Sequence, residues 1–119
     1  MKTHKCAYAH CLHQGEPVGD DEAVIIGGRY YHWDCAQTKS DIQELRDIYV
    51  SRIDPNVKVP VLGKVLNDLV FKYDQPIEYL KFSIKHFADY GTKIKSPFAL
   101  LYLRTNKVMR RKYEKEVSG

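Results

Sequence analysis

Four residues near the N-terminus have the types and the spacing of a metal site. Cys6 and Cys11 are separated by four residues, and after an interval of twenty residues His32 and Cys35 are separated by two. Thiolate sulfur and imidazole nitrogen are the donors that tetrahedral zinc takes in structural sites. The pattern therefore predicts one zinc ion held by Cys6, Cys11, His32 and Cys35.

This donor set would leave the ion with no free coordination position. Three thiolates and one imidazole complete a tetrahedron, whereas a catalytic zinc keeps one position for water. The three cysteines cannot all pair within one chain, and in a reducing compartment such clusters are more often metal ligands than disulfides. The spacing leaves open whether another nearby histidine replaces Cys11; the candidates are His4, His10 and His13.

A β-hairpin is predicted directly before the second ligand pair. Two β-prone runs, 23–26 and 29–32, are joined by Gly27-Gly28. Glycine supplies the positive φ that a two-residue hairpin turn requires. The second strand of this hairpin would end at His32.

A helix is predicted to follow the hairpin. Asp34 stands where a helix N-cap belongs, and apolar residues recur at helical spacing up to Pro55, which predicts a helix over 34–53. Cys35 would lie in the first turn, where the helix dipole favours a thiolate. A strand-end histidine and a first-turn cysteine can point at one ion, and this is the geometry of a treble-clef zinc site.

The rest of the chain has the pattern of packed helices. Prolines stand at the start of each apolar stripe, and Gly91 is placed to end one of them. The predicted helices cover 60–73, 76–90 and 97–113, and residues 104–106 could break the last one in two.

These patterns predict an α+β, mostly helical fold. A small zinc module of hairpin and helix, residues 1–40, would pack with a C-terminal region of three to four helices, residues 41–119. Apolar residues make up 44% and charged residues 29% of the chain, which is typical of a folded globular protein. No apolar run reaches the roughly 20 residues that span a membrane, and no secretory signal is recognised, so a cytoplasmic protein is expected.

The segment from Gly27 to Cys35 resembles the first zinc site of LIM domains. In those domains Cys-x2-Cys is followed, after a spacer of similar length, by His-x2-Cys. The first pair here is spaced by four residues, and the chain has no cysteines for the second LIM zinc site. The resemblance implies half of a LIM-like unit with a single structural ion.

Over nearly its full length the chain is also similar to small proteins of bacteriophages and mobile elements in Gram-positive bacteria. The matching segments are 30–35, 79–87 and 97–113. This resemblance implies a phage or prophage accessory protein in the cytoplasm of the host cell. Its expected partner is a host or phage protein machine, and inhibition of a host nuclease in counter-defence is one such role.

No pattern of a known catalytic site is recognised. The His-x-Glu and Pro-Cys-x2-Cys pair of zinc deaminases is missing, and Gly27-Gly28 lacks the surroundings of a phosphate-binding loop. Residues 36–53 contain no histidine that could serve a His-Asn-His nuclease. We therefore expect a protein that is not an enzyme.

Two surfaces are candidates for binding a partner. Tyr30, Tyr31 and Trp33 surround the ligand His32, and those of them that are exposed would be anchors for a protein. The alternative partner is nucleic acid, because cations concentrate near the C-terminus while the formal net charge of the whole chain is only +4. The candidate nucleic-acid contacts are Arg104, Lys107, Arg110, Arg111 and Lys112, and on one continuous helix 104, 107 and 111 would share a side.

Overall fold

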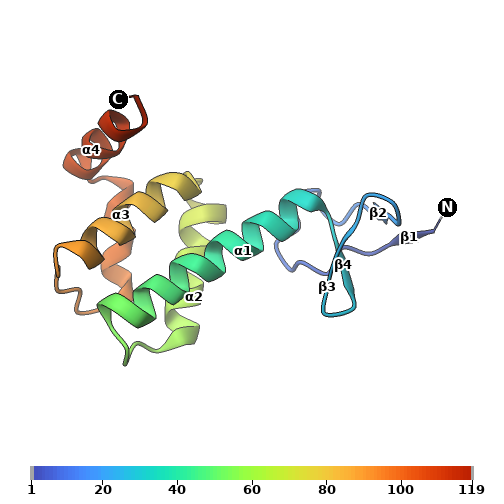
Figure 1. Cartoon of the computed structure of the whole chain (residues 1–119), viewed down its shortest axis with the longest axis horizontal. Helices are drawn as coiled ribbons and strands as arrows, with labels where there is room; N and C mark the ends of the chain where they lie inside the picture. The colour runs from blue at the N-terminus through green and yellow to red at the C-terminus, as the bar shows by residue number, and fades with distance from the viewer. Residues whose placement is uncertain (1, 119) are drawn as a thin grey trace. The chain divides into compact units, whose positions relative to one another are not determined.

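The computed structural model describes residues 2–118, which divide into two compact units. We call Met1–Asp41 the N-terminal unit and Ile42–Gly119 the helical unit. Helix α1, Trp33–Ile48, contains the boundary between them (Figure 1).

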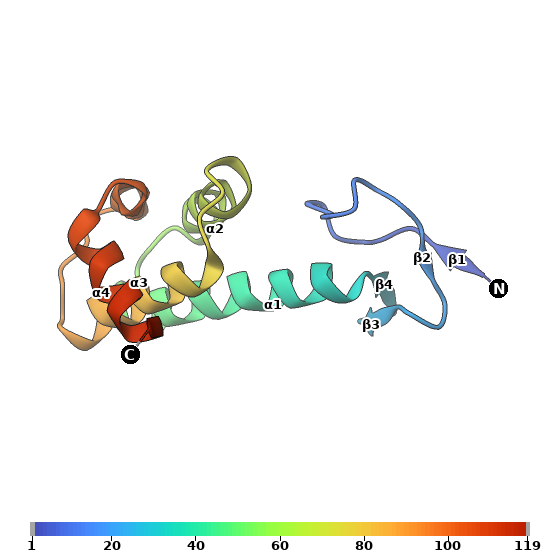
Figure 2. The same ribbon diagram turned by 90° about the horizontal axis from the view of Figure 1, so that it is seen from above.

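The N-terminal unit contains two short antiparallel strand pairs. The strands are β1 (Thr3–His4), β2 (Val18–Gly19), β3 (Val24–Ile26) and β4 (Arg29–Tyr31). In the first pair Thr3 lies opposite Gly19, and in the second Val24 lies opposite Tyr31. The long segment between β1 and β2 carries the first cysteine pair, and the strands of each pair run side by side (Figure 2).

The β3–β4 hairpin confirms the predicted turn. Gly27 and Gly28 have φ values of +58° and +76°, so both occupy the left-handed region. Two such residues in succession make the turn whose twist matches that of the flanking strands.

The core of the N-terminal unit is small. Its buried residues are Cys6, Tyr31, Cys35 and Ala36, and Tyr8, Cys11 and Val24 pack against them. So few apolar side chains bury little surface, and segments of this size are usually stabilised by a metal or by disulfides.

The helical unit is built from short helices with sharply defined ends. After α1 come η1 (Tyr49–Ile53), α2 (Val59–Asn67), η2 (Asp68–Lys72), α3 (Ile77–Asp89), η3 (Pro97–Arg104) and α4 (Lys107–Ser118). Pro60 lies in the first turn of α2, and Gly91 takes a φ of +61° just after α3. Ser96 caps η3, where its hydroxyl accepts a hydrogen bond from the Phe98 N–H at 3.3 Å.

Two predicted helices end in a wider turn than expected. The helix expected over 34–53 is α-helical to Ile48 and then π-helical, with the Asp54 N–H donating to the Tyr49 carbonyl at 2.9 Å. The helix expected over 60–73 ends in the same way in η2. Each π-helical turn places one residue in the core, Tyr49 in η1 and Leu69 in η2.

The apolar stripes of the helical unit meet in one core, as their spacing predicts. Its buried residues are Leu45, Tyr49, Leu62, Val65, Leu66, Leu69, Tyr79, Leu80, Ile84, Leu100, Leu103 and Met109. The mostly helical α+β fold is thus confirmed. Among the described residues, no helix combines the length and apolar character needed to cross a membrane.

Candidate metal centre

The four residues predicted as ligands lie together in the N-terminal unit. The ligand atoms of Cys6, Cys11, His32 and Cys35 are all within 4.8 Å of one another. The three cysteines are free, and the Sγ atoms of Cys11 and Cys35 are 3.8 Å apart, far beyond a disulfide bond length. The four residues could therefore hold a metal ion.

The separations between donors can be compared with those around a tetrahedral ion. Metal–sulfur bonds of about 2.3 Å and metal–nitrogen bonds of about 2.0–2.1 Å place two sulfurs about 3.8 Å apart, and a sulfur and a nitrogen about 3.6 Å apart. The Cys11 and Cys35 sulfurs are 3.8 Å apart, and His32 Nδ1 is 3.5 Å from Cys11 Sγ and 3.8 Å from Cys35 Sγ. These three residues thus have the spacing of a tetrahedral site, with Nδ1 as the histidine donor.

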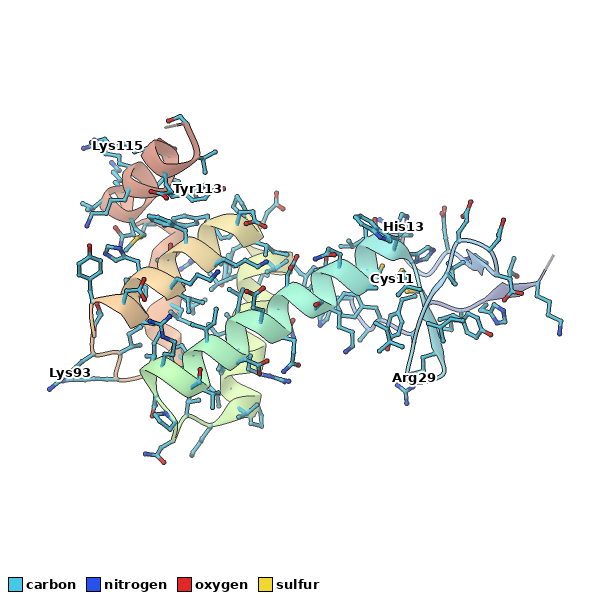
Figure 3. All side chains as sticks on the ribbon, in the orientation of Figure 1. Cys11, His13, Arg29, Lys93, Tyr113 and Lys115 are labelled. Atoms are coloured by element: carbon cyan, nitrogen blue, oxygen red, sulfur yellow. The ribbon has the colours of Figure 1, made fainter. Side chains whose placement is uncertain are left out.

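Backbone hydrogen bonds hold the segment of the first cysteine pair against the rest of the centre. The Ala7 N–H donates to the Tyr30 carbonyl at 2.9 Å, which attaches the residue after Cys6 to β4. The Leu12 N–H donates to Cys35 Sγ at 3.3 Å. Figure 3 shows Cys11 beside the start of α1. Backbone donors to a ligating sulfur are typical of the groups that support metal sites.

Burial and hydrogen bonding give two of the thiols different acidities. Desolvation raises the pKa of Cys35 to about 12. Desolvation also acts to raise the pKa of Cys11, but hydrogen bonds with the backbone of Gly15 and His13 and with the other two thiols together outweigh it and lower that pKa to about 7. Cys11 is therefore the thiol that ionises more readily, whereas ionisation of Cys35 needs a positive charge nearby.

An ion pair next to the centre holds the loop after Cys11. His13 Nε2 lies 2.8 Å from both carboxylate oxygens of Asp34, and Asp34 Oδ1 also accepts a hydrogen bond from the Cys35 N–H at 3.1 Å. The hydrogen bond with Asp34 is the main cause that raises the pKa of His13 and lowers that of Asp34. The His13 ring also lies 4.2 Å, centroid to centroid, from the ring of His32.

The other histidines near the first cysteine pair occupy separate places. His4 stacks on Tyr30 with ring centroids 3.6 Å apart, and its Nε2 is 2.9 Å from Asp20. His10 makes an edge contact with Tyr8. Among the described residues, the fourfold donor cluster contains neither of them, nor His13, which groups instead with Asp34 and Cys35. His4 and His13 are each paired with an aspartate instead, His4 with Asp20 and His13 with Asp34.

The three aromatic residues predicted as partner contacts have different surroundings. Tyr31 is 4% exposed in the core beside Cys35, and Tyr30 is half-buried under His4. Trp33 is 68% exposed. Tyr31 therefore contributes to packing, and Trp33 is the one of the three that offers an open ring.

The predicted basic residues do not share one helix. Arg104 ends η3, whereas Lys107 begins α4, so 104, 107 and 111 do not lie on the one continuous helix on which they would have shared a side. Thr105 and Asn106 form the break that the sequence indicated. Four of the five cations nevertheless line one pocket, and Lys112 is not among the residues that line it.

Comparison with family models, curated proteins and solved structures finds no match for this chain.

Proposed function

We propose that Cys6, Cys11, His32 and Cys35 bind one structural zinc ion. The observation that carries this proposal is the convergence of three sulfurs and one imidazole nitrogen within 4.8 Å of one another, of which Cys11, His32 and Cys35 have the separations of a tetrahedral site. Tetrahedral sulfur and nitrogen donors select zinc over magnesium and calcium, which take oxygen ligands. A bound divalent ion would also supply the positive charge that deprotonates Cys35.

The ion would act as a staple in a treble-clef-like module. Its ligands come from the β1–β2 segment, from the residue after β4 and from the first turn of α1, so one ion would connect three elements. The core of this unit is too small to stabilise it by apolar burial alone. Because four protein donors fill a tetrahedron, the ion would have no position for a substrate, and we propose a role other than catalysis.

Metal analysis of the purified full-length protein tests this proposal. We expect one zinc per chain, retained through dialysis and lost from Cys35→Ser together with folding of the N-terminal unit. His10→Ala is the matched control, since His10 lies in the same segment outside the donor cluster, and it should keep its zinc. A folded protein that carries no zinc under reducing conditions would refute the proposal.

We further propose that the zinc-stapled unit binds another protein. Trp33 is 68% exposed at the start of α1, and Ile25 of β3 is 59% exposed. Exposed aromatic side chains on a rigid scaffold are frequent anchors of protein interfaces. The sequence resemblance suggests a host or phage machine as the partner, which the protein would modulate without catalysis.

Retention of a partner by tagged protein in a nuclease-treated host lysate tests this role. The same defined protein should be retained by the native chain and by Tyr90→Ala, and it should be lost with Trp33→Ala. Tyr90 is the control because it is an equally open aromatic side chain, 75% exposed, in the helical unit. Equal retention by all three proteins would exclude Trp33 as the anchor.

A second candidate function is nucleic-acid binding through the helical unit. The observation that favours it is the gathering of Arg104, Lys107, Arg110 and Arg111 around one pocket. Lysine and arginine side chains that neutralise backbone phosphates provide most of the affinity of non-specific nucleic-acid binding. A fluorescence-anisotropy titration with labelled oligonucleotide tests it, and binding that weakens as salt is raised is the expected result.

A further inference from the structure

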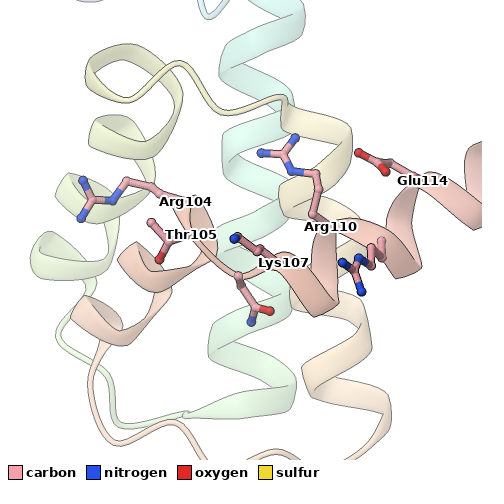
Figure 4. A pocket seen from close by; sticks show the side chains of 7 residues that line it. Arg104, Thr105, Lys107, Arg110 and Glu114 are labelled. Carbon is pink, nitrogen blue, oxygen red and sulfur yellow. The ribbon is translucent and has the colours of Figure 1, made fainter.

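A pocket of about 470 Å³ lies where η3 ends and α4 begins (Figure 4). Four cations and one carboxylate line it, so its walls carry a formal charge of +3. Its lining residues are Arg104, Thr105, Asn106, Lys107, Arg110, Arg111 and Glu114.

The local backbone explains how these cations come together. The Thr105 N–H donates to the Tyr102 carbonyl at 3.1 Å, and this bond closes η3. Asn106 then caps α4, because its Oδ1 accepts the Met109 N–H at 3.0 Å. Across the break between the helices, Arg104 of η3 lines the same pocket as Lys107 in the first turn of α4. On α4 itself, 107, 110 and 111 lie three and four residues apart and therefore on one face.

Two of the guanidinium groups are held in place by an aromatic ring and a hydrogen bond each. Arg104 lies over the ring of Tyr73, 4.1 Å from its centroid, and its Nε donates to the Leu101 carbonyl at 2.9 Å. Arg110 lies over the ring of Tyr79 at 4.1 Å, and its Nη2 donates to Gln75 Oε1 at 2.9 Å. A guanidinium has five N–H donors, so each keeps several for a ligand. Stacked arginines lose little further side-chain entropy on binding an anion.

The four cations of the pocket destabilise the protein in the absence of a ligand. The N-terminus of a helix carries a partial positive charge, which cations destabilise and anions stabilise. The first turn of α4 contains no acidic residue, and it begins with Lys107. Within residues 2–118, none of the four cations forms an ion pair with a carboxylate. An anionic ligand would relieve this repulsion.

We propose that this pocket binds a backbone phosphate of a nucleic acid, an inference that rests on the second candidate function above. Arginines that present a planar fork of donors match the oxygens of a phosphate, and the helix N-terminus adds further N–H donors. Tyr102 is 75% exposed in the η3 turn that Thr105 closes, which provides an open ring for stacking of a neighbouring base. The phosphate contacts would hold the strand, and the stacking would distinguish a nucleic acid from free phosphate.

The size of the effect follows from counterion release. Each phosphate contact contributes a slope of about 0.7 for single strands and about 0.9 for duplex in the dependence of log K on log salt. Loss of one contact therefore weakens binding about five- to eightfold at about 0.1 M salt. It also lowers the salt slope by a little under one.

The test compares two neighbouring charges in the full-length protein as purified. Arg111→Gln removes a cation from the pocket, whereas Lys112→Gln removes an equal charge from the adjacent residue outside it. A fluorescein-labelled oligonucleotide, single-stranded and as its duplex, is titrated between about 0.05 and 0.2 M salt. We expect the five- to eightfold loss for Arg111→Gln and less than half of that loss for Lys112→Gln. Arg104→Lys keeps the charge but loses the planar stack over Tyr73, and it should also weaken binding.

Competition with inorganic phosphate and with a mononucleotide distinguishes the sources of the anion. Displacement of the oligonucleotide only at millimolar or higher concentrations of either supports a backbone phosphate within a longer strand. Equal losses from Arg111→Gln and Lys112→Gln would overturn the pocket as the binding site while leaving nucleic-acid binding in place. Binding of inorganic phosphate without binding of any oligonucleotide would overturn both. Zinc content is measured separately and decides the proposal for the metal centre.

Discussion

Two tyrosines in the core of the helical unit provide a matched test of how hydrogen bonding contributes to its stability. Tyr49 and Tyr79 are both fully buried. The Tyr49 hydroxyl has no hydrogen-bond partner within the described part of the chain. The Tyr79 hydroxyl donates to the Leu103 carbonyl at 2.8 Å. The same change, tyrosine to phenylalanine, should therefore have opposite effects at the two positions.

The magnitudes follow from the energetics of buried polar groups. A buried donor or acceptor that lacks a partner costs about 1–3 kcal/mol, so Tyr49→Phe removes an unfavourable contribution and should stabilise the protein by about 1 kcal/mol. Tyr79→Phe removes a hydrogen bond from the core and should destabilise the protein by about 1–2 kcal/mol. The two variants should then differ in the free energy of unfolding by about 2–3 kcal/mol.

Urea unfolding of the full-length protein, followed by far-ultraviolet circular dichroism, measures this difference. The native midpoint should lie between those of the two variants, with unchanged slopes, because neither substitution alters the surface exposed on unfolding. Similar destabilisation by both substitutions would refute the reasoning, since it would mean that the Tyr49 hydroxyl has a partner or that ring packing determines both effects.

Three further predictions concern the turn, the helix cap and the ion pair beside the metal centre. Gly28→Ala should destabilise the hairpin by about 1–2 kcal/mol, and Gly28→Asn by less, as measured by thermal melting; the φ of +76° disfavours a Cβ although nothing would obstruct one. Asn106→Ala should cost about 1 kcal/mol in urea unfolding, because Asn106 caps α4 through Met109; an unchanged midpoint would contradict the cap. Asp34→Asn should lower the pKa of His13 in an NMR titration of its ring. Because the pair raises the pKa of His13 and lowers that of Asp34, its stability should be present between these two pKa values. It should be lost as pH rises through the raised pKa of His13 or falls through the lowered pKa of Asp34, and an identical titration in the variant would contradict this pairing.

The second donor pair and the hairpin before it could be predicted from the sequence because the relevant constraints are local. Only two residues separate His32 from Cys35, and the helix begins between them. The turn at Gly27-Gly28 depends on the backbone preference of those two residues alone. The helix boundaries at Pro60 and Gly91 are local in the same sense, since each depends on the backbone preference of one residue.

Contacts between distant segments could not be read in this way. Spacing alone left His4, His10 and His13 as rivals of Cys11. The choice depended on the fold of the β1–β2 segment, where His13 pairs with Asp34, twenty-one residues away. No repeating pattern in the sequence predicts that His13 and Asp34 come into contact.

The sequence by itself determined the donor types, the hairpin, the helical pattern and the concentration of charge near the C-terminus. Each of these follows from the chemistry of a residue or from a repeat of two to four residues. Only the tertiary structure decided that Tyr31 lies in the core and Trp33 on the surface. It also decided that, among the described residues, the Tyr49 hydroxyl is buried without a hydrogen-bond partner. Finally, it placed Arg104 at one pocket with cations of α4, although η3 and α4 are separate helices. The physical reason is that burial and pocket formation depend on which segments pack together. A local sequence pattern indicates only which segments have an apolar face that could be packed.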